Sequence, residues 1–408
     1  MASAWGVPAI VINTKNAALD LLGSRTTFAS KPKWPMAELI GRQSNVGFTY
    51  YGERLKRFRE VLRKPLNIQS ISLFWGPYLE EQSYNLCQSL FKDSEQFYAL
   101  VEINIQELIV MLTYGYRPDS QYLKVYHTMM RETGEALQPG RWAVNYIPAL
   151  KWVPAWFPGA GFQAWVECAR LRFTEVARTP FYKTKSNVLL GQGNTCFVQQ
   201  ALESLPERHS TDDEDIVMFA AGSLLSELQM CSFIYTFIFM MATHSDIQSR
   251  AHEEIIGICG SSSLPGPPDR AQLPFVECII QEVHRINPAV PLVPHSNSQE
   301  ADYAGYRIPK NSWIIANIWG MLHDDGVYLQ PQSFIPERFL SNENDLVQPG
   351  PRNLVYGFGP RRCPGENIAD LYLFLVTSRI LALFEISCVV EEGNCHIPTL
   401  EFDPGIAA

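Results

Sequence analysis

The feature that most constrains this chain is a long apolar segment near its middle. Residues 212–244 have helical periodicity and begin with four acidic residues at 212–215, which suit the positive end of a helix dipole. A helix of that length measures roughly 50 Å at 1.5 Å per residue. Because the segment is apolar nearly all round from 216 to 242, it predicts a buried central helix that other helices surround.

Composition and pattern extend this expectation to the whole chain. Of 408 residues, 46% are hydrophobic and 18% are charged, which excludes a disordered chain, a collagen or a coiled coil. Residues 78–137 also have helical periodicity, whereas strand signals are confined to 9–12 and 291–318. No internal repeat or domain boundary is visible. The sequence therefore predicts one mainly helical domain over residues 1–408, with a minor β part.

Charge and cysteine content narrow the functional classes. The net charge of −9 argues against non-specific binding of nucleic acid. Nine cysteines without a Cys-x-x-Cys pair disfavour a zinc site or a disulfide framework, and favour reduced thiols on the cytosolic side of a membrane. No apolar run reaches the ~18–20 residues of a membrane span, and the first residues lack a basic signal-peptide region. As written, the chain is expected to be cytosolic or peripheral to a membrane.

The segment at 356–365, with the sequence YGFGPRRCPG, carries the chemistry. Its glycines predict a tight loop with exposed backbone N–H groups. Cys363 follows two arginines and precedes a helix that begins near Glu366, and both features favour a thiolate. Such a loop-held thiolate is a suitable anionic axial ligand for a haem iron. The alternative, a buried structural cysteine in a Gly-rich turn, is disfavoured for this string.

This segment resembles the haem-binding loop of the cytochrome P-450 family, whose pattern is Phe-x-x-Gly-x-Arg-x-Cys-x-Gly. The pattern maps onto Tyr356, Gly359, Arg361, Cys363 and Gly365, with Tyr in place of Phe. The resemblance implies heme b as cofactor, with the Cys363 thiolate as axial ligand of its iron. It also implies that Gly359 and Gly365 belong to the cofactor loop and that Arg361 pairs with a haem propionate.

Further positions match the same family. Glu282 and Arg285 form its Glu-x-x-Arg on one face of a helix, and Arg338 lies in its Pro-Glu-Arg-Phe segment. The resemblance implies a buried ion network among these three residues. It also places Arg59 and His295 as further propionate partners, with a surface cation or a core histidine as the alternatives.

The central helix departs from the family. There the family has Ala-Gly-x-Asp/Glu-Thr-Thr, whose acid and alcohol relay protons. Aligned without gaps from the helix end, the motif falls on 225–230, with Leu228 at the acid and Gln229 at the alcohol position. Gln229 and Ser232 share a face, and we hypothesise that they hold a water that replaces the relay; the alternative is that they pack or line the pocket. Realignment onto Ala221-Gly222 requires four inserted residues inside the helix.

The aromatic, Pro-rich segment 147–159 predicts a packed loop and suggests a fungal, microsomal-type branch of the family. In that branch a membrane helix and hinge precede the domain and hold it on the cytosolic face of the endoplasmic reticulum, and a strand follows the turn at 401–406. The chain is expected to be a form truncated at both ends.

The resemblance implies a monooxygenase that inserts one atom of O₂ into a lipophilic substrate, in secondary metabolism or xenobiotic oxidation. The alternatives are a haem-thiolate isomerase, a peroxide-using enzyme or a non-catalytic haem-binding remnant. The chain lacks a nucleotide-binding signature, so electrons are expected from NADPH-cytochrome P-450 reductase. Basic residues at 54–64, with Arg352 and Arg362, are expected to form its docking face; the alternative is an ordinary solvated helix face.

Overall fold

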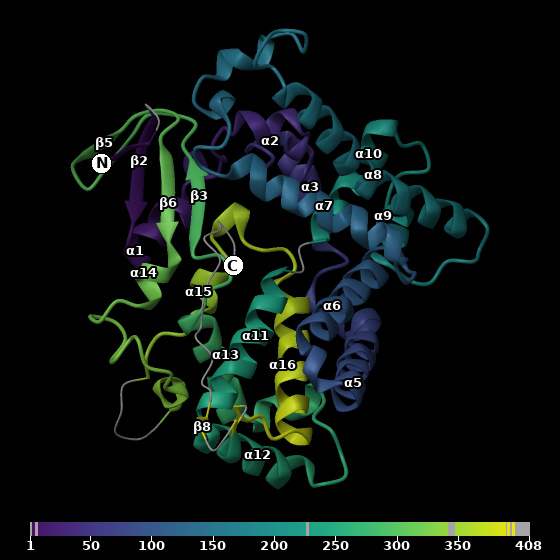
Figure 1. Ribbon diagram of the computed structural model, residues 1–408, viewed down its shortest axis with the longest axis vertical. Coiled ribbons are helices and arrows are strands. Elements are labelled where there is room, and N and C mark those ends of the chain that lie inside the picture. Colours follow the sequence, from purple (N-terminus) through teal and green to yellow (C-terminus); the bar gives the residue numbers. More distant parts are fainter. Residues whose placement is uncertain are drawn as a thin grey trace.

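The computed structural model describes residues 2–4, 7–225, 228–341, 347–388, 390–391 and 394–395. A large helical part lies beside a small sheet (Figure 1), which confirms the predicted fold class. The longer helices are α3 (Glu53–Arg63), α5 (Gly76–Lys92), α6 (Phe97–Tyr114), α7 (Ser120–Leu137), α8 (Phe162–Leu189), α10 (Thr211–Leu224), α11 (Leu228–Thr243), α12 (Ser245–Cys259), α13 (Pro274–Ile286) and α16 (Glu366–Leu383). The shorter helices are α1 (Lys15–Ala18), α2 (Pro35–Leu39), α4 (Ile68–Ser70), α9 (Phe197–Glu203), α14 (Ile318–Leu322) and α15 (Arg352–Val355).

The main sheet joins the N-terminal strands of the chain to two strands from residues 292–317. Its strands are β1 (Ala2–Ala4), β2 (Val7–Ile12), β6 (Trp313–Asn317) and β3 (Leu292–Ser296), in that spatial order. Strand β2 runs parallel to β6, and β3 runs antiparallel to β6 with His295 opposite Ile314. Two further hairpins pair β4 (Ala301–Tyr303) with β5 (Tyr306–Ile308) and β7 (Val390–Glu391) with β8 (Asn394–Cys395).

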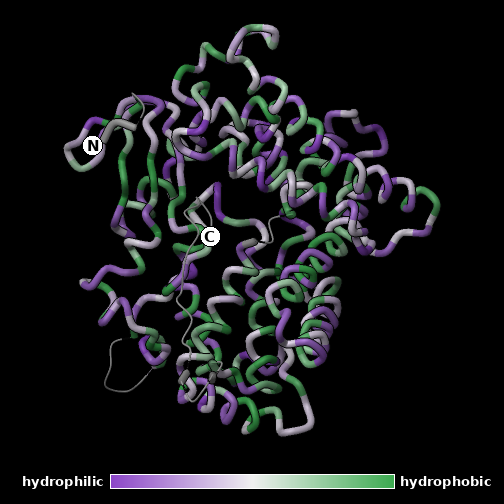
Figure 2. The backbone as a smooth tube through the Cα atoms, viewed as in Figure 1, coloured by the Kyte–Doolittle hydropathy of each residue, from purple (hydrophilic) through white to green (hydrophobic). Residues whose placement is uncertain are grey.

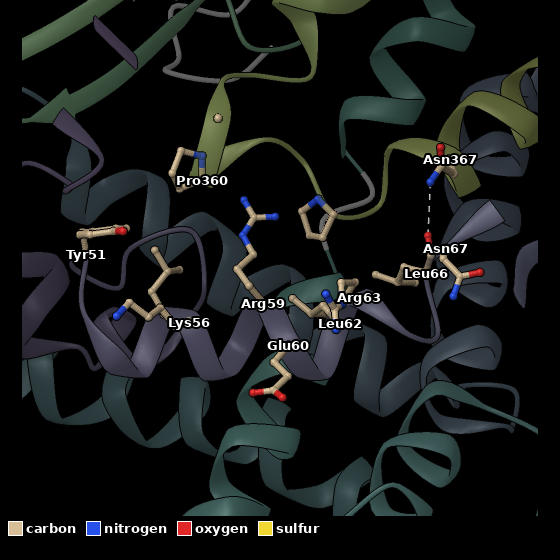
Figure 3. Close-up of a pocket in the computed structure, with 13 residues that line it drawn as sticks. Tyr51, Lys56, Arg59, Glu60, Leu62, Arg63, Leu66, Asn67, Pro360 and Asn367 are labelled. Carbon is tan, nitrogen blue, oxygen red and sulfur yellow. Dashed lines mark hydrogen bonds between the residues drawn. The ribbon is translucent and has the colours of Figure 1, made fainter. Parts of the chain in front are cut away.

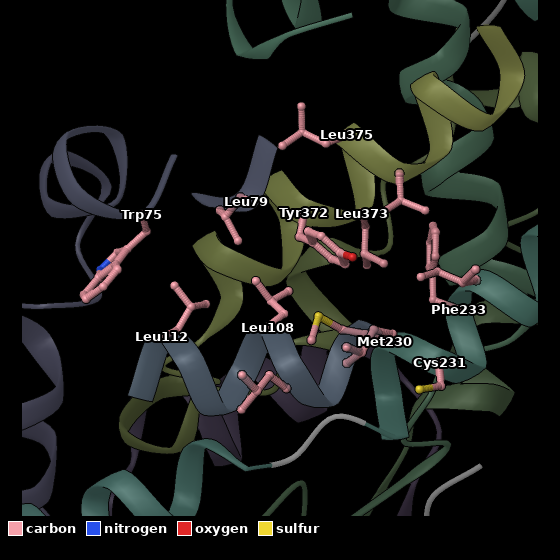
Figure 4. Packing of buried hydrophobic residues seen from close by; sticks show 14 of the residues in the cluster. Trp75, Leu79, Leu108, Leu112, Met230, Cys231, Phe233, Tyr372, Leu373 and Leu375 are labelled. Carbon is pink, nitrogen blue, oxygen red and sulfur yellow. The ribbon is translucent and has the colours of Figure 1, made fainter. Parts of the chain in front are cut away.

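The hydrophobic core centres on α16, which lies between α5 and the group α11, α12 and α13 (Figure 1). Leucines of α5 and α6 pack against Tyr372 and Leu373 of α16, close to Phe233 of α11 (Figure 4). Figure 2 shows hydrophobic stretches along these central helices and along β3 and β6. Because α16 is surrounded on several sides, its position fixes the loop that precedes it.

The central helix is interrupted, so the expectation of one helix over 212–244 is wrong. Helix α10 ends at Leu224 and α11 begins at Leu228. Leu225 has φ −72° and ψ 52°, outside the helical region, and its carbonyl accepts a hydrogen bond of 2.6 Å from the hydroxyl of Tyr126 on α7. This side chain replaces the helical partner that the carbonyl gives up. The predicted burial is confirmed, because Val217 and Ile234 are fully buried.

Two apolar stretches are long enough to cross a membrane: Ser94–Tyr114, which contains α6, and Thr211–Thr243, which contains α10 and α11. In each, more than half of the tested window is buried inside the fold. A helix that is apolar all round also serves as a core helix of a large domain, and their burial fits that role.

Residues 147–159 form a loop rather than an α-helix, as predicted, but the prediction that this loop is packed is wrong. A 3₁₀ turn spans Pro148–Trp152, and the side chains of Trp152 and Trp156 are 78% and 81% exposed. Prolines at 148, 154 and 158 stop a helix from forming, and without a regular face the segment has no apolar side to lay on the core.

Candidate functional site

The cysteine loop connects α15 to α16 and is tied to itself by backbone bonds. The N–H of Cys363 donates to the carbonyl of Tyr356 at 2.7 Å. The N–H of Gly365 donates to the Cys363 sulfur, as expected for a loop that stabilises a thiolate. Helix α16 begins at the next residue, so the sulfur lies at a helix N-terminus.

Cys363 is an exposed residue of this loop, and the surrounding protein still desolvates its sulfur. Burial raises its pKa, and this outweighs the lowering by the Gly365 N–H, Arg59 and Arg362. The cationic neighbours and the helix N-terminus were expected to favour the thiolate. Without a bound metal their effect on the pKa of the Cys363 thiol is too small, so that expectation is wrong for the protein without haem. The loop residues Gly359 and Pro364 on either side of it line a cavity, and a metal ion bound to the exposed sulfur would supply the missing positive charge.

A cavity of about 740 Å³ lies between α3 and the cysteine loop (Figure 3). One wall is apolar and includes Leu55, Leu62 and Leu66, and the loop contributes Gly359 and Pro364 to the lining. From α3 the guanidinium of Arg59 reaches toward the loop, as Figure 3 shows. An apolar wall with a cation suits a flat apolar ligand that carries carboxylates.

A group of cationic side chains surrounds this region without acidic partners. Burial, together with Arg361 and Arg59, lowers the pKa of Lys31 to about 7. The Lys31 ammonium donates to the Pro294 carbonyl at 3.0 Å, and Nε of Arg59 is buried without a hydrogen-bond partner. None of Lys31, Arg59 and Arg361 forms an ion pair with a carboxylate of a described residue. Such a cluster is unfavourable unless an anion joins it, and two haem propionates fit it.

Lys31 is the site residue that the sequence reasoning missed. A lysine between a serine and a proline carries no local signal, because most lysines are solvated. Its burial arises from the approach of β3 and the cysteine loop, which are distant in sequence.

Arg361 binds the chain segment that precedes α3. Its Nε donates to the Ala29 carbonyl at 2.7 Å, its Nη1 donates to the Val46 carbonyl at 3.1 Å, and its Nη2 donates to the Thr49 carbonyl. These contacts hold the segment against the cysteine loop and keep the charge of Arg361 beside Lys31 and Arg59.

His295, on β3, is fully buried. Its Nδ1 lies 3.0 Å from the Phe28 carbonyl, and its Nε2 is buried without a hydrogen-bond partner. Burial, followed by the charge of Lys31, holds the pKa of His295 well below its usual range, so the ring is neutral. The structure thus brings His295, Lys31 and Arg361 together.

The glycines of the loop differ in role. A Cβ on Gly359, whose φ is +46°, would lie 2.4 Å from the Gly23 carbonyl oxygen, so this position requires close backbone packing. A Cβ on Gly365 would meet only the Cys363 sulfur, at 4.0 Å.

The ion network expected around Glu282 is confirmed. Its carboxylate bonds Arg285 at 2.8 and 2.9 Å and Arg338 at 3.0 Å, and all three side chains are buried. Arg285 also donates to three backbone carbonyls, at Leu322, Pro331 and Ser333, so the network ties α13 to the chain that leads to the cysteine loop.

Gln229 and Ser232 lie on α11, both partly buried. The Ser232 hydroxyl accepts a hydrogen bond of 3.3 Å from Nδ2 of Asn287, which also donates to Thr236 at 2.7 Å. Ser232 therefore belongs to a polar cluster between α11 and the end of α13. Residue 227 lies outside the described residues.

The interruption of the central helix bears on the motif alignment. The realignment onto Ala221-Gly222 was disfavoured because it needs four inserted residues inside a helix. Since the helix is interrupted here, the insertion need not lie inside a helix, and that objection no longer holds. That alignment puts Leu224 at the acid position and Leu225 at the alcohol position. In both alignments a leucine stands where the family has an acid.

The expected basic face is smaller than the sequence suggested. Arg57 pairs with Asp213 at 2.7 Å, Arg352 pairs with Asp370 at 2.7 Å, and Arg362 pairs with Glu366. Lys56, Arg63 and Lys64 are exposed.

Comparisons with known proteins decide the family. The family model described as Cytochrome P450 matches residues 4–403. The chain is a cytochrome P450. It is 31% identical to Cytochrome P450 monooxygenase ppsD of Aspergillus oryzae, over 98% of this chain and 78% of that one. It is 32% identical to Cytochrome P450 monooxygenase COX2 of Coprinopsis cinerea, over 95% and 76%.

The fold agrees with this assignment. A zebra fish cytochrome P450 solved with abiraterone superposes with a TM-score of 0.76 at 23% identity, covering 100% of this chain and 92% of its own. The predicted family and its fungal branch are confirmed. As a cytochrome P450, the protein is a monooxygenase of the oxidoreductase class, and the family carries a haem iron on a thiolate.

Proposed function

We propose that Cys363 binds the iron of heme b as its axial thiolate, with Lys31, Arg59, Arg361 and His295 around the propionates. The observation that carries this proposal is an exposed thiol at a helix N-terminus beside three partly buried cations that have no acidic partner among the described residues. Gly359 and Gly365 shape the loop that presents the sulfur. Residues 1–408 then work as one cytochrome P450 domain.

When bound, the haem would supply the oxygen chemistry, in which O₂, two electrons and two protons place one oxygen atom in the substrate and release the other as water. The residues of the chain itself position the sulfur that would bind the haem iron. The Gly365 N–H holds the sulfur in place, and the ion network of Glu282 fixes the backbone that leads to it.

The substrate class is proposed from the surroundings of the central helix. Leu225 and Met230 are buried and Leu224 is half-buried, so the helix presents little polar surface. This favours a small lipophilic substrate. Gln229 and Ser232 stay proposed as the water-holding pair that assists proton delivery. NADPH consumption that is less well coupled to product in Gln229→Leu supports this role, and unchanged coupling contradicts it.

A second candidate function is peroxide-driven turnover or isomerisation. The leucine at the acid position in both alignments favours it, because leucine cannot relay a proton. Turnover with reductase and NADPH supports the monooxygenase reading, whereas turnover with hydroperoxide alone supports this candidate. No turnover by either route would indicate a haem-binding remnant.

We further propose NADPH-cytochrome P-450 reductase as the electron donor, at the cytosolic face of the endoplasmic reticulum membrane. The exposed cations Lys56 and Arg63 of α3 line the cavity next to the cysteine loop, and the exposed Lys64 directly follows the helix. Charge reversal at Lys56 and Arg63 should raise the reductase concentration needed for half-maximal rate, with Lys183, on α8, as the control.

The deciding experiment is the CO difference spectrum of the reduced, haem-loaded protein. The wild type should show the Soret band of a thiolate-ligated haem, and Cys363→Ser should lose it while keeping its fold by circular dichroism. Cys168→Ser, which changes an exposed cysteine on α8, is the control and should retain the band. A wild-type protein without the band would overturn the proposed ligand.

A further inference from the structure

Three buried polar atoms behind the cysteine loop have no hydrogen-bond partner among the described residues. They are Nε2 of His284, the hydroxyl of Tyr356 and Nη2 of Arg352. His284 belongs to α13, Arg352 belongs to α15, and Tyr356 directly follows α15. Buried polar atoms in native proteins nearly always have a partner, which is often an ordered water.

The three groups are neighbours. The rings of His284 and Tyr356 meet edge to face, with centroids 5.7 Å apart and planes at 67°. Arg352 and Asp370 act electrostatically on both rings. Arg352 donates from Nε to Asp370 at 2.7 Å and from Nη1 to Glu277. These two bonds fix its guanidinium and do not use Nη2.

Their hydrogen-bonding capacities are complementary to one water molecule. Burial and the charge of Arg352 lower the pKa of His284 to about 3, so its ring is neutral. Nη2 of Arg352 donates only, the Tyr356 hydroxyl donates and accepts, and a neutral imidazole nitrogen does one or the other. A water accepts two bonds and donates two, so one molecule satisfies all three groups.

The same residues connect the central helix to the ligand loop. On one side, the ring of Phe233 on α11 lies 4.6 Å from the ring of His284. On the other side, the Tyr356 carbonyl accepts the Cys363 N–H. A displacement of Tyr356 therefore moves the bond that orients Cys363.

We propose that His284, Tyr356 and Arg352 enclose one buried water behind the cysteine loop, and that this water makes Tyr356 a positioning residue for Cys363. The inference rests on the proposed role of Cys363 as haem ligand. It explains what the hydroxyl does at a position where the family pattern has Phe, which has none.

The test uses the full chain loaded with haem. In mild urea, the reduced CO complex loses its thiolate band at a rate that reports on Cys363 ligation. Tyr356→Phe and His284→Phe should each accelerate this loss roughly fivefold, the effect of removing one buried hydrogen bond. The double variant should be no faster than either single one, because both remove the same water. His284→Gln, which keeps a polar group, should lie close to the wild type.

Tyr114→Phe is the matched control, because the Tyr114 hydroxyl on α6 is also buried without a partner but is remote from the loop. It should leave the rate unchanged. Rates within twofold of wild type for both loop variants, or fully additive effects, would overturn the inference while leaving the thiolate assignment intact. A wild type that never shows the thiolate band would overturn both. Should the variants fail to fold, a high-resolution crystal structure decides, since a water bonded to all three groups supports the inference and a dry site overturns it.

Discussion

At the scale of single residues, the site depends on positions where chemistry and close packing coincide. Cys363 supplies the sulfur, but Gly359 determines where the loop runs, because only a glycine permits its approach to the backbone at Gly23. Likewise Lys31, Arg59 and Arg361 place three partly buried positive charges close together, which a bound anion would stabilise.

Replacing Gly359 by Ala should destabilise the protein by about 2–4 kcal/mol, because the new Cβ meets backbone atoms and φ is positive. The matched change Gly365→Ala, which meets no atom closer than 4.0 Å, should cost far less. Urea unfolding of both variants measures the difference. Equal midpoints would contradict the packing role of Gly359.

Replacing Lys31 by Met should have opposite effects with and without haem. Without haem, the variant loses a buried cation that repels Arg59 and Arg361, so its thermal midpoint should rise. With haem, it loses a charged partner of a propionate, so haem transfer to apomyoglobin should be roughly tenfold faster. Lys33→Met, two residues away, is the control. A slower haem loss would contradict this assignment of Lys31.

At the scale of elements, a buried ion network joins α13 to the approach to the cysteine loop. Glu282 is the single acid for two buried guanidiniums, Arg285 and Arg338, and none of these side chains is more than 2% exposed. Such a network adds little net stability but fixes the relative positions of the elements that it joins. Removing Glu282 would leave two buried guanidiniums without a negative partner.

Glu282→Gln should therefore destabilise the protein by about 3–5 kcal/mol and reduce haem incorporation. Glu337→Gln breaks only the exposed pair with Arg250 and should cost about 1 kcal/mol or less. Denaturant unfolding and the yield of haem-loaded protein are the measurements. A small effect of Glu282→Gln would mean that the two arginines find other acids.

At the scale of the whole molecule, burial of neutral histidines makes stability depend on pH. Burial lowers the pKa of His284 from 6.5 to about 3 and holds that of His295 far below its usual value. In acid, the unfolded chain takes up protons at these positions and the folded chain does not. Stability due to these residues is therefore complete above pH 6.5 and is lost as the pH falls from about 6.5 toward 3.

The urea midpoint should accordingly fall between pH 7 and pH 5, by up to about a tenfold change in the folding constant per pH unit for each buried histidine. The His284→Phe variant should show a shallower dependence over this range. His127→Phe, which changes a half-exposed ring, should keep the wild-type dependence. Parallel curves for all three proteins would contradict the assignment to His284.

The family, the mainly helical fold, the Gly-rich loop around Cys363 and the partners of Glu282 could all be predicted from the sequence. These features are carried by contiguous motifs, whose local chemistry is readable without the fold. The sequence could not predict the interruption at Leu225, the position of Lys31 beside Arg59 and Arg361, the ion pairs of Arg57 with Asp213 and of Arg352 with Asp370, or the raised pKa of the thiol. Each of these depends on a partner distant in the chain: Tyr126 for Leu225, β3 and the cysteine loop for Lys31, and the surrounding protein for the sulfur. Burial and long-range contacts set the free energy of these groups, and neither is encoded in the residues next to them.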